Sequence, residues 1–517
     1  MNILGIGGLL SDAAAVLIQN GQVTAAIEES KLTRRSQSGR LPDAAIASCL
    51  KLGWITADDV DYVALARPLP TGAVIPLALQ SFGNSRIVTV DHHAAHAASA
   101  YLASPFDEAT VITLDCEGDL RCGGKWHGTG NHLTLDEEIL YPDSIGQLYG
   151  RVTQLLGFTA RADEHRLQWL SATGEPRWLE IFEDITGGHS FDRTYFDFGR
   201  QGNGGFSSKF FDRLGISTAS ELTESDRANL AASIQRALEN YVMRLATGAK
   251  NICLAGGVAW NALLISALEH SGRYEGVFAQ PAAGNAGTAL GAALQVWHES
   301  AGGAARVQDG AYCLGPQFSA QEIKQVFENC KLRLHLLPTV PETLSNAVRL
   351  LKANQIVAWM QGRMEFGPRA LGNRSILASP HDPYSAENLN AFIKHRESSR
   401  KFAASVPAEL AERYFEAGPN ARHLATVSRV KEPYQEQFRG AILANDLIRV
   451  HTVSRDDNPL YWQLLHAFGE ATGLPVLYNT SFNLFGEPLV CTPRDAVRSF
   501  YSSGIDAMIA GNFLLEK

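Results

Sequence analysis

Apolar runs that end in glycines open the chain. Residues 2–7 are mostly apolar, and two further apolar runs, residues 13–18 and 23–27, flank Asn20-Gly21. Asn-Gly between two apolar runs is a strong hairpin signal, because both residues tolerate the positive φ angles of a type I′ turn. The pattern therefore predicts a strand, a glycine turn and then a β-hairpin.

A similar pattern returns in residues 110–115, an apolar run that ends at Asp115 and is followed by glycines. Two openings of this kind predict two lobes of related topology, as in the actin-like and sugar-kinase ATPases, which bind nucleotide between their lobes. Between the openings, we expect a strand over residues 86–90 and an alanine-rich helix over residues 92–103.

Residues 225–245 have the spacing of a long amphipathic helix. Its apolar positions recur three or four residues apart, at Leu230, Ile234, Leu238, Tyr241 and Leu245. A strand is expected over residues 251–255, which end at Gly256-Gly257. This alternation of strand and helix predicts α/β layers.

Two prolines in residues 336–342 indicate a boundary between domains. Beyond them, residues 345–352 are expected to form a helix and residues 356–360 a strand, so the C-terminal part is expected to be a separate α/β domain. Because 517 residues exceed what one hydrophobic core usually supports, we expect two domains, residues 1–338 and 339–517.

Composition and charge restrict the partners. The net charge of −9 disfavours a chain whose main task is to hold a nucleic-acid backbone, although local basic clusters could still bind small anions. The seven cysteines are scattered without a Cys-x-x-Cys pair, which is typical of reduced thiols. The first apolar stretch lacks the basic start of a signal peptide, and no apolar run is long enough for a membrane span. We therefore expect a soluble, cytoplasmic protein.

His92 and His96 lie four residues apart, so on a helix both project from one face. Two imidazoles in this arrangement suit a divalent transition metal, and Asp115, at the end of a strand, is the natural third ligand. The alternative is a pair of histidines that bond to the backbone at the start of a helix. No glutamate follows His92, so this is not the helix motif of zinc proteases.

Two glycine-rich blocks follow predicted strands. The first contains Gly256, Gly257 and Asn261, and the second contains Gly284 and Asn285. Glycines after strands let a backbone approach a nucleotide, and a following helix N-terminus favours anions. Close helix packing explains the same glycines equally well.

The densest concentration of positive charge is in residues 363–401. Seven basic residues stand there: Arg363, Arg369, Arg374, Lys394, Arg396, Arg400 and Lys401. Arginines on glycine turns hold guanidinium groups ready for phosphate or carboxylate oxygens. A solvated basic surface is the usual explanation of a charge run, but apolar residues and glycines surround these arginines. Residues 479–483 (NTSFN) add hydroxyl and amide groups after a strand expected over residues 475–478, so we expect this domain to bind anions.

Three segments resemble the carbamoyltransferase family that includes the nodulation-factor, cephamycin and tobramycin enzymes. They are residues 364–375 (MEFGPRALGNRS), residues 479–483 together with 486–488 (GEP), and residues 92–96 (HHAAH). The likeness extends over nearly the whole chain. It implies an N-terminal domain of the actin-like ATPase superfamily and a C-terminal YrdC-like domain.

The resemblance implies an ATP-dependent O-carbamoyltransferase of the kind used in antibiotic biosynthesis. The C-terminal domain would make carbamoyl-adenylate from carbamoyl phosphate and ATP, and the N-terminal domain would transfer the carbamoyl group to a hydroxyl of a small natural product, such as a sugar hydroxyl. The implied donor and ATP site comprises Arg369, Arg374, Lys394, Arg396, Arg400, Arg449, Asn479 and Ser481. The implied adenylate site of the N-terminal domain comprises Gly256, Gly257, Asn261, Gly284 and Asn285.

The metal of this family is iron, for which the resemblance implies the ligands His92, His96, Asp115 and Asn285. Histidine and carboxylate ligands would also accept zinc or manganese. The family has an aspartate where this chain has Asn285, so metal affinity should be lower because the amide carries no charge. Two further possibilities are Mg²⁺ bound together with the nucleotide and assembly of the chain into a homodimer.

The N-terminal domain departs from the family pattern at three further places. Ser11-Asp12 stands where the family has His-Asp, residues 34–37 (RRSQ) replace Arg-x-Lys-His, and residues 164–171 differ from the usual Tyr-Lys-Val-Met-Gly stretch. We infer an altered acceptor pocket or an altered general base. The candidates for that base are Asp12, His165 and Arg34.

Three alternatives remain at this stage. The acceptor could be a macromolecule, a protein thiol or tRNA, but the acidic chain disfavours tRNA, and the extra modules of the hydrogenase-maturation relative are absent. The chain could instead be a non-catalytic paralogue that binds nucleotide or carbamoyl phosphate, because family residues are lost at Ser11, Ser36 and Asn285. A metallopeptidase would leave the arginine cluster unexplained.

Overall fold

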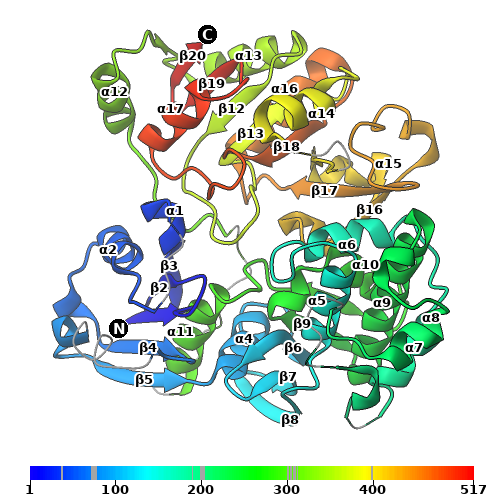
Figure 1. The fold of residues 1–517 in the computed structure, drawn as a ribbon. Helices are drawn as coiled ribbons and strands as arrows, with labels where there is room; N and C mark the ends of the chain where they lie inside the picture. Colours follow the sequence, from blue (N-terminus) through cyan, green and yellow to red (C-terminus); the bar gives the residue numbers. More distant parts are fainter. Residues whose placement is uncertain are drawn as a thin grey trace.

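The strands of the protein form three sheets in the computed structural model (Figure 1). The residues that the structure describes are 1–35, 39–70, 79–188, 190–197, 199, 204–299, 302, 306, 310, 312–396 and 400–517. Within them, two sheets have five strands each and the third has ten.

The first two sheets share one topology. Their strand orders are β3-β2-β1-β4-β5 and β8-β7-β6-β9-β10. In each sheet the first three strands of the chain are antiparallel neighbours, and the next two run parallel to the first. The first sheet consists of β1 (Asn2–Gly7), β2 (Ala14–Gln19), β3 (Gln22–Glu28), β4 (Tyr62–Ala66) and β5 (Arg86–Val90). We call this sheet together with its helices the first lobe, and the second sheet together with its helices the second lobe. The sheet of the second lobe consists of β6 (Glu108–Gly118), β7 (Arg121–Thr129), β8 (His132–Leu140), β9 (Asn251–Ala255) and β10 (Gly276–Ala279).

This shared order confirms the prediction of two related lobes and an α/β fold. The predicted hairpin is also confirmed, because Asn20-Gly21 joins β2 to β3 with φ angles of 49° and 83°.

Two helices lie between the sheets of the lobes and pack against each other, α4 (His92–Tyr101) and α11 (Gly287–Glu299) (Figure 1). The helix predicted over residues 92–103 thus ends two residues early. A side-chain carbon added to Gly291 would lie 1.7 Å from the carbonyl oxygen of Ala95, so the two backbones can approach this closely only at a glycine.

Further helices cover the outer faces of the lobes. The long helix α9 (Glu224–Leu245) begins one residue before its predicted start, where Thr223 and Asp226 form a capping box. The first lobe adds α1 (Glu29–Thr33) and α2 (Asp43–Leu52). The second lobe adds α5 (Ile145–Leu155), α6 (Glu164–Ser171), α7 (Leu179–Thr186), α8 (Ser208–Leu214) and α10 (Ala262–Glu269).

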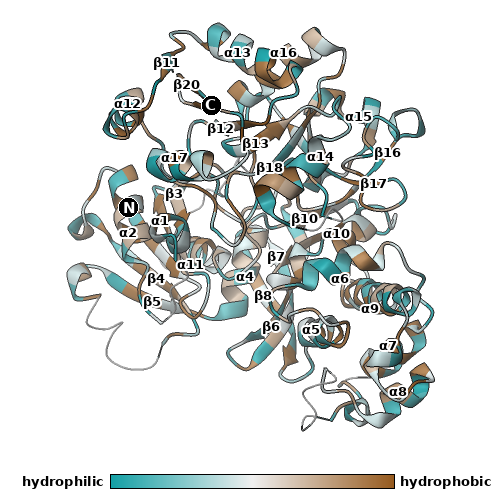
Figure 2. Ribbon diagram, turned by 45° about the horizontal axis from the view of Figure 1, so that its top comes forward, coloured by the Kyte–Doolittle hydropathy of each residue, from teal (hydrophilic) through white to brown (hydrophobic). Residues whose placement is uncertain are grey.

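The third sheet has the strand order β11-β20-β19-β12-β13-β18-β14-β17-β16-β15. Figure 2 shows brown, the colour of hydrophobic residues, along its central strands. The strands are β11 (His335–Leu336), β12 (Val357–Met360), β13 (Arg374–Ala378), β14 (Ala403–Pro407), β15 (Phe415–Glu416), β16 (Ser428–Val430), β17 (Leu447–Val453), β18 (Leu477–Ser481), β19 (Ala507–Ala510) and β20 (Phe513–Glu516). Its α-helices are α12 (Ala320–Asn329), α13 (Val340–Lys352), α14 (Ser385–Asn388), α15 (Ala411–Tyr414), α16 (Pro459–Thr472) and α17 (Pro493–Tyr501).

The third sheet takes its first elements from before the expected boundary at residue 339. Both α12 and β11 precede it; α12 packs on α17 and β11 pairs with β20. The prolines that indicated a linker instead precede and begin α13, where Thr339 caps the helix and Pro341 occupies its first turn. In the described part of the chain, no helix combines the length and the apolar character that a membrane crossing requires.

We expect Gly291→Ala to lower the free energy of unfolding by about 1–3 kcal/mol, because the added methyl group must displace the backbone of α4. Gly150→Ala in α5 is the matched control, since a methyl group there would meet its nearest atom, Oε1 of Glu164, at 3.5 Å. The higher helix propensity of alanine should raise stability at that position by up to about 1 kcal/mol. Urea unfolding of both variants checks the expectation, and equal shifts would contradict the packing explanation.

Candidate active site

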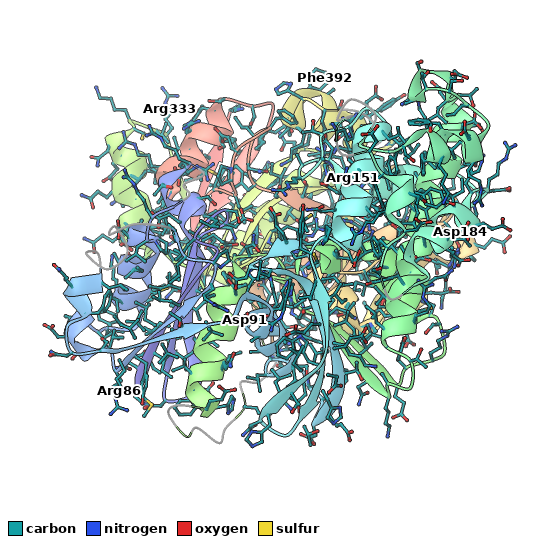
Figure 3. The ribbon with its side chains drawn as sticks, turned by 60° about the horizontal axis from the view of Figure 1, so that its bottom comes forward. Arg86, Asp91, Arg151, Asp184, Arg333 and Phe392 are labelled. Atoms are coloured by element: carbon teal, nitrogen blue, oxygen red, sulfur yellow. The ribbon has the colours of Figure 1, made fainter. Side chains whose placement is uncertain are left out.

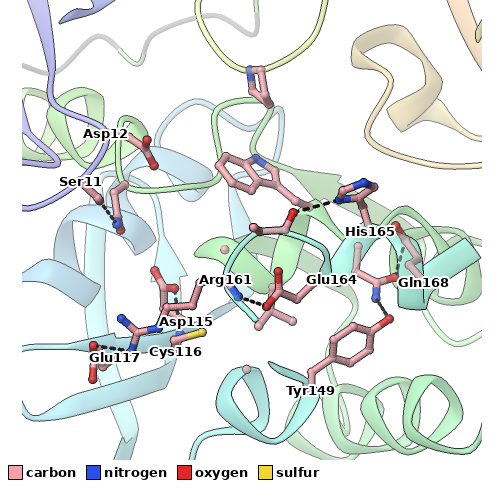
Figure 4. Close-up of a pocket in the computed structure, with 18 of the residues that line it drawn as sticks. Ser11, Asp12, Asp115, Cys116, Glu117, Tyr149, Arg161, Glu164, His165 and Gln168 are labelled. Atoms are coloured by element: carbon pink, nitrogen blue, oxygen red, sulfur yellow. Dashed lines mark hydrogen bonds and ion pairs between the residues drawn. The ribbon is translucent and has the colours of Figure 1, made fainter. Parts of the chain in front are cut away.

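A cavity of about 950 Å³ is lined by residues of both lobes and of the C-terminal sheet. The first lobe contributes the loop after β1, and the second lobe contributes the end of β6 together with α5 and α6. In the close-up of Figure 4, Asp12 and Asp115 lie on one side of the pocket and His165 and Gln168 on another. The side chains at its two ends differ in charge and chemistry.

Helix α4 brings two imidazoles to one end of the cavity. Asp91, labelled in Figure 3, caps the helix by accepting hydrogen bonds from the backbone N–H groups of His93 and Ala94. The Nε2 atoms of His92 and His96 lie 3.6 and 3.4 Å from Oδ2 of Asp115, which stands on β6. The three residues that the spacing singled out are therefore together, with His96 fully buried.

The donor atoms of this group are buried, and none of them has a hydrogen-bond partner in the described part of the chain. They are Nε2 of His92, Nε2 of His96, Oδ2 of Asp115 and Oδ1 of Asn285. Neighbours occupy other polar atoms of His92 and Asn285: Nδ1 of His92 is 3.1 Å from the carbonyl oxygen of Arg67, and Nδ2 of Asn285 donates to Ser11. Nδ1 of His96 is also buried and has no hydrogen-bond partner among the described residues. Buried polar atoms left without partners are costly, and two imidazoles, a carboxylate and an amide oxygen are ligands of a divalent transition metal. The residues present therefore fit such an ion.

The charge states of Asp115 and His96 suit a cation as well. Burial opposes ionisation of Asp115, yet the two neighbouring imidazoles hold the pKa of its carboxyl well below its usual range. Burial lowers the pKa of His96, so its imidazole is neutral and its lone pair is available. Burial opposes protonation of His92, but Asp115 raises its pKa, so a bound cation would have to displace the proton of that imidazole.

At the other end, arginines of the C-terminal part face the cavity. The basic residues that line it are Arg369, Arg396, Arg400, Lys401 and Arg449. Burial lowers the pKa of Arg369 to about 10, and burial together with three neighbouring arginines lowers the pKa of Arg449. Among the described residues, neither of these two guanidinium groups forms an ion pair with a carboxylate. The guanidinium carbon of Arg449 instead lies 4.7 Å from the ring centre of Trp169 on α6.

Two other basic residues of the expected donor site do not line this cavity. Arg374 is fully buried and its guanidinium donates to five backbone carbonyls, including those of Gln361 and Pro316. Lys394 donates to the carbonyl oxygens of Ser481 and Asn483 at 2.6 and 3.0 Å. Protein oxygens, most of them backbone carbonyls, accept hydrogen bonds from both cations, so both hold local structure here.

The amide and hydroxyl of the NTSFN segment also lie off the cavity lining. β18 extends to Ser481, so Asn479 and Ser481 belong to the strand and do not follow it. Ser481 donates to Oδ1 of Asn483. Asn479 donates to the carbonyl oxygen of Ala370, next to Arg369, and its buried Oδ1 has no partner.

The glycine-rich blocks contain residues that line the cavity and glycines that are closely packed. Gly257, Asn261 and Asn285 line the cavity, whereas Gly256 and Gly284 do not. A side-chain carbon on Gly256 would lie 2.2 Å from the carbonyl oxygen of Leu114, and one on Gly284 would lie 2.4 Å from Trp260. Close packing therefore requires these two glycines.

Two of the three candidates for the general base line the cavity. The side chain of Asp12 faces the cavity. The protein that surrounds it partly buries its carboxyl, and this burial together with the nearby Asp115 raises the pKa of the carboxyl. His165 on α6 has its Nε2 buried without a partner, and burial followed by Arg400 lowers its pKa to about 4. Arg34 lies elsewhere: it donates to the carbonyl oxygen of Leu489 and pairs with Glu487 at 3.4 Å. Ser36 and Gln37 lie outside the described residues.

Several lining residues have no sequence signal of their own. Glu117 and Arg161 form an ion pair of 2.8 Å, and Tyr149 and Trp169 contribute aromatic surface. These residues come from three separate elements, so only the tertiary fold brings them together.

Two family models match the chain. The model described as "Carbamoyltransferase N-terminus" matches residues 70–294, and "Carbamoyltransferase C-terminus" matches residues 348–517. An uncharacterized protein of Synechocystis is 34% identical over 100% of this chain and 97% of its own length. Nodulation protein NolNO of Sinorhizobium fredii is 33% identical over 98% of this chain and 79% of its own. Nodulation protein NolO of Bradyrhizobium diazoefficiens is 34% identical over 83% and 79%. The solved structure of HypF from T. kodakarensis aligns with 58% of this chain and 48% of its own, at 16% identity and a TM-score of 0.35.

We propose that the four buried donor atoms hold a divalent transition metal, and we expect Asn285→Asp to raise affinity for Zn²⁺ or Fe²⁺ roughly tenfold or more because it adds a charge to the ligand set. His96→Ala should abolish tight binding, whereas His127→Ala, at a half-exposed histidine of β7, should leave it unchanged. Calorimetric titration of the metal-free protein measures all three. Unaltered affinity in His96→Ala would contradict the ligand assignment.

Proposed function

Because the chain belongs to the carbamoyltransferase family, we propose that it uses ATP and carbamoyl phosphate to carbamoylate a hydroxyl group of a small molecule. Family membership makes it an enzyme with a carbamoyl donor and an acceptor. The identity of the donor, the use of ATP and the hydroxyl acceptor are the parts that we infer. The observation that carries the proposal is that Arg369 and Arg449, which form no ion pair with a carboxylate of the described residues, line a cavity that also reaches the metal-ligand set.

Donor activation belongs at the arginine end. Formation of carbamoyl-adenylate from carbamoyl phosphate, ATP and water releases pyrophosphate and phosphate, so the site must hold two polyanions at once. Buried cations stabilise such charge far more than exposed ones, because little water screens them. Arg369 and Arg449 are suited to this role, since no carboxylate among the described residues competes for either, and a pKa of about 10 keeps the guanidinium group of Arg369 cationic near pH 7.

Transfer belongs between the arginine end and the metal-ligand set, because Asp12 lies on the side of Asp115 and His165 lies beside Arg400. The acceptor oxygen would attack the carbamoyl carbon of the adenylate, the bond from that carbon to the AMP oxygen would break, and the acceptor proton would pass to Asp12 or His165. Asp12 has a raised pKa, and neutral His165 has a buried Nε2 without a partner. The chemistry that a metal on His92, His96, Asp115 and Asn285 would supply, when bound, is Lewis-acid polarisation of an oxygen.

The continuous cavity supports a direct passage between the two steps. Carbamoyl-adenylate is a mixed anhydride that water hydrolyses, so release into solvent between activation and transfer would waste it. Since residues of both ends line one space of about 950 Å³, the intermediate need not leave the protein.

We expect Arg369→Gln and Arg449→Gln each to lower kcat/KM for pyrophosphate release by about 10²-fold or more, because each removes a cation beside the transferring phosphates. Arg494→Gln, at an exposed arginine of the same sheet domain, is the matched control and should retain the wild-type rate. The assay contains ATP and carbamoyl phosphate without acceptor. Absence of pyrophosphate release by the wild type would instead favour the non-catalytic paralogue.

We expect Asp12→Asn or His165→Gln to lower transfer by about 10²-fold while pyrophosphate release stays intact, because a general base acts only on the acceptor. A base must be unprotonated, so transfer should fall as the pH drops through the raised pKa of Asp12 or through about 4 for His165. If His165 is the base, no inflection is expected near 6.5, the ordinary value for histidine. The pH profile of transfer to an alcohol found by screening measures this, and full transfer in both variants would refute both candidates.

A further inference from the structure

The loop that carries Arg369 is packed mainly by the N-terminal lobes. We call residues 363–374, between β12 and β13, the arginine loop. Met364 and Ala370 are buried in the core of the first lobe. Phe366 and Leu371 are buried in the core that lies between the two lobes. The arginine loop therefore takes its shape from a part of the protein outside its own sheet.

A buried ion pair of the first lobe forms hydrogen bonds with the arginine loop. Nζ of Lys31 lies 2.8 Å from Oε2 of Glu28, and the two residues are 5% and 7% exposed. Lys31 also donates to the carbonyl oxygens of Glu365 and Gly367, at 2.9 and 2.6 Å. Oε1 of Glu28 accepts a hydrogen bond of 2.9 Å from the backbone N–H of Gly367. Both polar groups of the Gly367 backbone are thus held by one ion pair.

The backbone conformation of Gly367 sets the direction of the arginine loop. Its φ angle is 106°, which glycine adopts readily and other residues rarely. A side-chain carbon there would lie 3.3 Å from the carbonyl oxygen of Pro281 in the second lobe, so the backbone is confined from that side as well. Arg369 follows two residues later and lines the cavity. Pro368, between Gly367 and Arg369, has a fixed φ angle and makes this short connection stiff.

We propose that the Glu28–Lys31 ion pair is a positioning device for Arg369, through which the first lobe controls activation of the donor at the C-terminal sheet. The ion pair does not touch the cavity and acts only through the arginine loop. This inference rests on the proposed function, because it takes Arg369 as a residue that binds the phosphates of the donor.

The combined variant Glu28→Gln/Lys31→Met tests the proposal. It removes both charges together, since removal of one would leave the other buried without a partner. We expect kcat/KM for pyrophosphate release, and affinity for inorganic pyrophosphate measured by calorimetry, to fall about 10- to 100-fold, as for other positioning residues. In an Arg369→Gln background the same change should add less than about twofold, because the group that it positions is already absent.

Two variants separate positioning from general stability. Glu487→Gln weakens the contact of Arg34 between the same two parts of the chain without touching the arginine loop, and it should retain pyrophosphate affinity. The single variant Lys31→Arg keeps donors for the two carbonyl oxygens, so most of the pyrophosphate affinity that the combined variant loses should be present in it. If the combined variant fails to fold, Glu28→Gln/Lys31→Gln, which also removes both charges, replaces it and should show the same dependence on Arg369.

An equal loss in the presence and absence of Arg369, or no loss at all, would overturn the positioning role. Lack of turnover by the wild type would contradict the proposed function. Pyrophosphate affinity would then still report whether Arg369 depends on the ion pair, so the two failures are distinguishable.

Discussion

Like charges that face one another in a confined space are the feature on which the rest of the site depends. Arg369, Arg396, Arg400 and Arg449 line one cavity, and burial together with the proximity of the other three lowers the pKa of Arg449. Folding must hold such groups together against their repulsion, and a bound polyanion relieves it. On the proposed function, the donor and ATP supply that polyanion, so part of the binding energy comes from repulsion already present in the free protein.

The backbone that carries these cations is held from outside the cavity. Asn390 accepts a hydrogen bond from Nε of Arg396, and the ring of Trp169 covers the guanidinium of Arg449. The arginine loop is fixed from two sides, by the carboxylate of Glu365 within it and by the Glu28–Lys31 pair beyond it. Because these supports come from different parts of the chain, the position of the cavity arginines depends on contacts between those parts.

Local features could be predicted from the sequence, and tertiary ones could not. The hairpin at Asn20-Gly21 and the grouping of His92 with His96 depend on spacing within one or two elements, and both predictions agree with the structure. Arg369 and Arg374 lie five residues apart in one loop and look equivalent in the sequence. Oε1 of Glu365 accepts hydrogen bonds from three backbone N–H groups, including that of Arg374, and the loop turns Arg374 inward while Arg369 faces the cavity.

The same distinction explains the other differences. Arg34 matches the first residue of a family motif, yet its side chain donates to the carbonyl oxygen of Leu489. This contact joins two segments that are 455 residues apart in the sequence. The prolines before α13 are compatible with the first turn of a helix as well as with a linker, and the capping pair Thr339 and Glu342 decides for the helix.

A crystal structure with carbamoyl phosphate and a non-hydrolysable ATP analogue tests the central claim most directly. The account predicts phosphate oxygens within hydrogen-bonding distance of the guanidinium groups of Arg369 and Arg449, inside the cavity that the metal-ligand set also borders. Phosphates bound elsewhere, with these two arginines unengaged, would contradict it.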